Sequence, residues 1–125
     1  MTSGQKRNSV TDVLVDTNVF IDLIRGIRPL AAGQDRISYS VITRVELFAG
    51  AADQERHVRQ LLSPFDEISV DDLVAERAGR LRRDRRMKLA DAIIAATALE
   101  YGKTLVTRNR RDFERVRGLK LRSPD

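Results

Sequence analysis

Four acidic residues occupy positions that suggest chemistry. Asp16 ends the apolar run VLV, Glu46 lies among apolar residues in RVELF, Asp91 precedes AIIAA, and Asp112 follows LVTRN in RRDF. Carboxylates brought together in a low dielectric repel one another, and a hard divalent cation with oxygen ligands, Mg²⁺ or Mn²⁺, relieves that repulsion. Such an ion activates water and offsets charge on a phosphate. We therefore interpret Asp16 as a metal ligand that the other three acids could meet.

Each acid also has a simpler explanation, which the residues alone leave open. Asp16 and Asp91 could be ordinary acids at helix N-termini, where the helix dipole favours them. Glu46 could pair with Arg44, and Asp112 could be a solvated turn residue. For any single acid the simpler explanation is the better one, and only the joint pattern favours a metal site.

The elements that would position these acids alternate between strand and helix. Strands are predicted at 13–15, 36–40, 65–70, 103–107 and 119–121, and the main helices at 17–25, 41–50, 53–62, 71–86 and 91–102. Thr17, Ser40 and Asp71 are expected to cap helices, with Asp53 and Asp91 opening two others. This alternation predicts an α/β fold with a mostly parallel sheet covered on both faces. Sites in such sheets form beyond the carboxyl ends of the strands.

Length and composition limit the kinds of protein that this chain can be. The chain has 125 residues, which predicts one domain over 11–125 after a flexible polar tail at 1–10. The absence of cysteine excludes disulfides and thiolate zinc sites. No apolar run suits a signal peptide or a bilayer span, so we expect a cytoplasmic protein. The net charge of +5, from 23 basic and 18 acidic residues, favours an anionic partner.

Four ordered blocks, LVDTNVFID, ISYSVITRVELFAG, KLADAIIAATAL and TLVTRNRRDFERV, resemble the successive blocks of PIN-domain nucleases, most closely the VapC toxins of toxin–antitoxin pairs. The resemblance implies a PIN-like three-layer α/β/α sandwich with a mostly parallel central sheet of about four to five strands. It also implies an endoribonuclease, dependent on Mg²⁺ or Mn²⁺, that cuts structured tRNA or rRNA. A homodimer and a cognate VapB-type antitoxin are the implied partners.

Residue by residue, the resemblance makes Asp16, Glu46, Asp91 and Asp112 the catalytic residues and metal ligands. Asn109 stands where many PIN domains carry an aspartate, so Asp112, the nearest remaining acid, is the choice for the fourth position. Supporting polar roles are expected for Asn18, Thr107 and Asn109. Hydrolysis by water would leave 5′-phosphate and 3′-hydroxyl ends.

Arginines close to the acids are expected to hold the RNA, although a solvated helix face explains any one of them equally well. The candidates are Arg82, Arg83, Arg85, Arg86, Arg108 and Arg110. The main alternative is a PIN-like module that binds RNA without cutting it. A DNA nuclease is chemically possible. A receiver domain is disfavoured, because Asp16 is not one of a pair and Lys103 precedes its strand.

Overall fold

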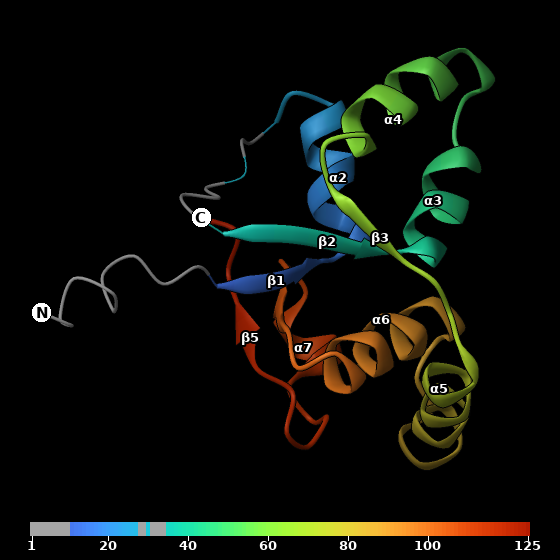
Figure 1. Cartoon of the computed structure of the whole chain (residues 1–125), viewed down its shortest axis with the longest axis vertical. Helices are drawn as coiled ribbons and strands as arrows, with labels where there is room; N and C mark the ends of the chain where they lie inside the picture. The colour runs from blue at the N-terminus through green and yellow to red at the C-terminus, as the bar shows by residue number, and fades with distance from the viewer. Residues whose placement is uncertain (1–10, 28–29, 31–34) are drawn as a thin grey trace, which may run out of the picture.

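A single parallel sheet forms the centre of the protein. The computed structural model describes residues 11–27, 30 and 35–125. Five strands pair in the order β3-β2-β1-β4-β5, and every pairing is parallel (Figure 1). The strands are β1 (Asp12–Val15), β2 (Arg36–Ser40), β3 (Asp66–Ile68), β4 (Thr104–Val106) and β5 (Leu121–Arg122). The predicted α/β class and strand number are confirmed.

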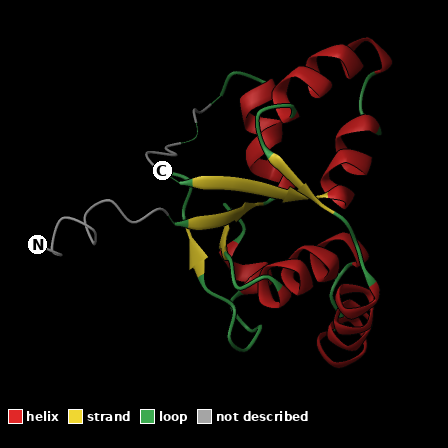
Figure 2. Ribbon diagram, viewed as in Figure 1, coloured by secondary structure: helices red, strands yellow, loops and turns green. Residues whose placement is uncertain are grey.

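Helices cover both faces of this sheet, which gives the expected three layers (Figure 2). One layer holds α2 (Thr17–Ile24), α3 (Val41–Phe48), the 3₁₀ turn η1 (Ala52–Gln54) and α4 (Glu55–Leu62). The other holds α5 (Asp72–Arg85), α6 (Leu89–Glu100) and α7 (Arg110–Phe113). Among the described residues, no helix is long and apolar enough to cross a membrane.

Strand β1 is buried on both faces, as expected for a central parallel strand. Val13 and Val15 pack with Phe20 of α2 in one apolar cluster. Leu14, between them, packs with Ile94 of α6 in the cluster on the opposite face. Because successive strand residues point to opposite faces, this three-residue run anchors both helical layers. It also fixes the position of Asp16, the next residue.

Helices α5 and α6 pack through small side chains. Val74 and Ala78 of α5 meet Ala92 and Ala96 of α6 in one buried cluster. The chain turns between the helices at Arg86, whose φ of 56° is left-handed. This short connection sets the first turn of α6, and therefore Asp91, against the end of the sheet.

Some local predictions were wrong by a few residues. Asp16, rather than Thr17, holds the N-cap position of α2, and its side chain makes no capping hydrogen bond. Helix α6 begins at Leu89, so Asp91 lies within the first turn and does not open the helix. Asp53 lies in η1, and α4 begins at Glu55. The tail predicted for residues 1–10 lies outside the described residues.

Candidate active site

The four predicted acids gather at the carboxyl edge of the sheet. Asp16 directly follows β1, Glu46 lies on α3 after β2, Asp91 on α6, and Asp112 on α7 after β4. Their charges act on one another. The pKa of Asp16 responds to Asp91 and Glu46, and the pKa of Asp91 responds to Asp112 and Glu46. The fold therefore brings together acids that lie far apart in the sequence, as Asp16 and Asp91 show.

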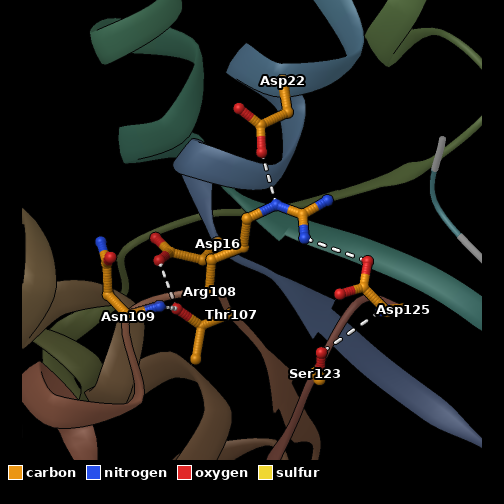
Figure 3. Close-up of polar contacts among 7 residues, drawn as sticks. All are labelled: Asp16, Asp22, Thr107, Arg108, Asn109, Ser123 and Asp125. Carbon is orange, nitrogen blue, oxygen red and sulfur yellow. Dashed lines mark hydrogen bonds and ion pairs between the residues drawn. The ribbon is translucent and has the colours of Figure 1, made fainter. Parts of the chain in front are cut away.

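Asp16 is the most buried of these acids, with 3% of its surface exposed. Its Oδ2 accepts a hydrogen bond of 2.8 Å from the Thr107 hydroxyl, which itself accepts one of 2.9 Å from the Asn109 backbone N–H (Figure 3). The pKa of Asp16 is raised from 3.8 to about 6, chiefly by burial and also by the charges of Asp91 and Glu46, and the Thr107 hydrogen bond opposes this rise. The carboxylate thus sits where its own charge is disfavoured unless a cation joins it.

Glu46 is held by threonines. The Thr17 hydroxyl donates to Glu46 Oε1 at 2.7 Å and shares a hydrogen bond of 2.9 Å with the Thr43 hydroxyl. The suggested pairing of Glu46 with Arg44 is wrong, because Arg44 binds Glu67 and the Tyr39 hydroxyl instead. Sequence reasoning missed Thr17 and Thr43 in this role. The available signal was the spacing of Thr43 and Glu46, which places both on one helix face.

Asp91 and Asp112 face an open pocket of about 650 Å³. Burial raises the pKa of Asp91, Asp112 and Glu46 raise it further, and Lys88 lowers it. The remaining lining is mostly charged, with five basic side chains: Arg85, Arg86, Lys88, Arg111 and Arg115. Asp84 and Glu114 also line it, so the pocket combines four acids with a basic wall. This arrangement is suited to a phosphate held next to a metal.

The donor set suits Mg²⁺ or Mn²⁺, because all four acids offer oxygen ligands. In the side-chain arrangement of the described residues, no three of these acids stand close enough together to hold one ion. The fit rests instead on electrostatics. Asp16 and Asp91 both have raised pKa values, through burial and through neighbouring carboxylates, and a divalent cation would relieve both causes.

The predicted RNA-contacting arginines separate into groups. Arg85 and Arg86 line the pocket beside Asp91 and Asp112. Arg82 donates to the Met87 carbonyl and Arg83 pairs with Asp84, so both lie outside its lining. Arg110 is exposed on α7. Lys88 and Arg115, which sequence reasoning did not select, do line the pocket.

Arg108 has intramolecular partners. Its guanidinium forms ion pairs with Asp22 of α2 and with Asp125, and only 16% of its side chain is exposed (Figure 3). Arg108 follows Thr107 directly, so these ion pairs stabilise the turn whose Thr107 hydroxyl binds Asp16. A contact between Arg108 and RNA stays a prediction, and the structure gives this arginine a structural task.

The two asparagines differ in setting. Asn18 is exposed on the first turn of α2. Asn109 is half-buried, and its backbone N–H holds the Thr107 hydroxyl that binds Asp16. Thr107 thus contacts Asp16 directly, whereas Asn109 contributes a backbone N–H, and the expected roles of the Asn109 and Asn18 side chains stay predictions.

Comparison with known proteins agrees with this geometry. The PIN domain family matches residues 13–119. The chain is 30% identical to the tRNA(fMet)-specific endonuclease VapC of Shigella flexneri, over 86% of this chain and 93% of that protein. It is 32% identical to Ribonuclease VapC1 of Methanocaldococcus jannaschii, over 87% of this chain and 85% of that protein. The DNA-bound VapBC structure from Salmonella typhimurium superposes with a TM-score of 0.79 at 26% identity, covering 94% of this chain and all of that chain. The chain therefore belongs to the PIN-domain family, within its VapC group.

Proposed function

We propose that this chain is the toxin of a type II toxin–antitoxin system, and that it is an endoribonuclease dependent on Mg²⁺ or Mn²⁺. One observation carries the proposal. Asp16 is buried at the carboxyl edge of the sheet, and both its burial and its neighbours Asp91 and Glu46 disfavour its charge. A structural acid gains nothing from that setting, whereas a bound cation would compensate it, which supports a role for Asp16 as a metal ligand.

Asp16 and Asp91 would hold the metal directly, and Glu46 and Asp112 would hold it directly or through water. When bound, the ion would lower the pKa of a water molecule and offset charge on the phosphate oxygens. Thr107 fixes the orientation of Asp16, and Thr17 fixes that of Glu46. Arg85, Arg86 and Lys88 line the same pocket as Asp91 and would bind the phosphate backbone.

The substrate is proposed to be structured RNA, tRNA or rRNA. The Shigella flexneri relative is named for a tRNA, which supports that choice. The VapBC structures support a VapB-type antitoxin as the partner that neutralises the nuclease. We also propose a homodimer, a cytoplasmic location, and a PIN domain that spans residues 11–125.

The test is cleavage of total bacterial RNA by the purified protein with Mg²⁺, with Mn²⁺ or with chelator. Asp91→Asn is the matched variant, because it removes one charge without changing the size of the side chain. Cuts at a few sites that need metal and disappear in Asp91→Asn would support the nuclease. Intact RNA that both proteins bind equally would reject it and favour a PIN-like module that binds RNA without cutting.

A further inference from the structure

A second, smaller hollow adjoins the pocket of the candidate active site. It measures about 260 Å³ and lies between the C-terminal half of α5, the end of α6 and the loop after α7. Asp84, Arg85 and Val116 line both hollows, so the two lie next to each other, and together they are called the track. One end of this track holds Asp91 and Asp112, the acids proposed for cleavage.

The far end of the track is basic. Four arginines and one acid line it: Arg77, Arg80, Arg85, Arg117 and Asp84. Two of these charges have partners, since Arg77 pairs with Glu100 and Asp84 with Arg83. Within the described part of the chain, no ion pair or side-chain hydrogen bond engages the other three arginines. The hollow therefore offers three guanidinium groups to an anion from outside.

We propose that Arg80, Arg85 and Arg117 form a phosphate subsite for the RNA strand beside the bond that is cut. This inference rests on the proposed function. An RNA strand with one phosphate at Asp91 and Asp112 has to continue beyond the pocket. Because Arg85 lines both hollows, the strand can pass along it to Arg80 and Arg117. Arginine suits this task, because its planar guanidinium binds phosphate oxygens through two hydrogen bonds.

RNA fits this track better than an acidic peptide does. The track begins at the acids proposed to hold the metal, where a phosphodiester is the group that is cut, so an RNA strand would occupy both ends of the track. An acidic peptide would occupy only the basic end. Leu81, Leu99 and Val116 form an apolar part of the second hollow, against which the sugar of a nucleotide can lie.

The test compares Arg80→Gln and Arg117→Gln with Arg56→Gln. Arg56 is exposed on α4, in the opposite layer, so its variant makes the same change in net charge far from the track. Binding of bulk tRNA would be measured in chelator over a range of salt concentrations. Relative to Arg56→Gln, each track variant should raise the Kd about threefold to tenfold and lower the salt slope by about one. With metal and saturating RNA, cleavage rates should stay within about twofold of wild type, because neither arginine touches the reacting phosphate.

Several results would overturn the inference. Track variants that bind tRNA as well as Arg56→Gln would show that the hollow takes no phosphate. Loss of binding to a polyglutamate peptide, with tRNA binding unchanged, would assign the hollow to an acidic protein. If either result is obtained while the wild-type protein still cleaves RNA with metal, only the phosphate subsite is rejected and the proposed nuclease stands. If wild type neither cleaves nor binds RNA, the proposed function fails with it.

Discussion

At the scale of single residues, Asp16 links fold and chemistry. The apolar run before it sets a carboxylate at the end of a buried strand, where burial raises its pKa to about 6. Only the Thr107 hydroxyl and local backbone groups favour its charge. The same setting that would favour a cation bound to Asp16 therefore destabilises the metal-free protein.

This destabilisation predicts that the free energy of unfolding, measured in the presence of chelator, depends on pH. Folded Asp16 has a pKa of about 6 against 3.8 when unfolded, so the folded state holds its proton more tightly. The contribution of Asp16 to the free energy of unfolding should fall as pH rises from about 4 to about 6, by roughly 3 kcal/mol in all. Asp16→Asn should remove this fall and be more stable than wild type at neutral pH by about 1–3 kcal/mol.

Urea unfolding at several pH values checks this prediction. The quantity to compare is the difference between Asp16→Asn and wild type, because acids that do not interact with Asp16 contribute equally to both proteins. Asp53→Asn, an exposed acid in η1, is the control. An Asp16→Asn protein that is less stable than wild type at neutral pH would show that Asp16 is an ordinary structural acid.

Thr107 is predicted to matter through Asp16. Thr107→Val keeps the shape of the side chain and removes the hydroxyl that donates to Asp16. Loss of a group that orients a metal ligand costs about 10–100-fold in metal affinity or activity. The Mn²⁺ concentration for half-maximal RNA cleavage should rise by about that factor, and Thr107→Ser should restore it. An unchanged Mn²⁺ requirement would leave Thr107 with a packing role only.

The acids at the edge of the sheet and the support of Asp16 by Thr107 could be predicted from sequence, and the threonines that hold Glu46 could not. An acid inside an apolar segment is conspicuous, so Asp16, Glu46 and Asp91 were selected before the fold was known. Thr17 and Thr43 look like ordinary helix residues, and their contact with Glu46 depends on how α2 packs against α3. The ion pairs of Arg108 could not be predicted, because nothing in the sequence brings Asp22 and Asp125 to it.

At the scale of elements, the ion pair between Arg108 and Asp22 joins the turn after β4 to α2. Both side chains are mostly buried, with 16% and 19% exposed. Removing one member of such a pair leaves the other charge without its partner. Arg108→Gln should therefore lower the free energy of unfolding by about 2–3 kcal/mol.

Arg110→Gln is the matched control for this prediction, because Arg110 is exposed two residues away and should change stability by about 0.5 kcal/mol or less. A double-mutant cycle with Asp22→Asn isolates the pair. Additive effects of the two substitutions would contradict a direct interaction. A fall in RNA affinity without any change in stability would instead restore Arg108 as an RNA contact.

Element types were predictable, and element ends were less so. Ser40 caps α3 and Asp71 caps α5 as expected, because each side chain accepts a hydrogen bond from a backbone N–H of its helix. Asp16 holds a cap position without capping, because its carboxylate binds Thr107 instead. Helix α6 begins two residues before Asp91, at Leu89, since the left-handed Arg86 allows the chain to re-enter a helix early.

At the scale of the whole molecule, alternation of strand and helix was enough to predict the parallel sheet and its two helical layers. The strand order could not be derived from periodicity, because it depends on which strands lie side by side. That order places β1 between β2 and β4. The elements that carry Glu46 and Asp112 follow these two neighbours of β1, so both acids reach the edge where Asp16 lies.

The most direct test of the account is the chemistry of the RNA ends. The account holds that water, activated at a metal held by Asp16, Glu46, Asp91 and Asp112, attacks the phosphodiester. Fragments made by wild type with Mg²⁺ or Mn²⁺ should then carry 5′-phosphate and 3′-hydroxyl ends, and none should form in chelator. Ends with a cyclic 2′,3′-phosphate, or equal cleavage in chelator, would contradict it.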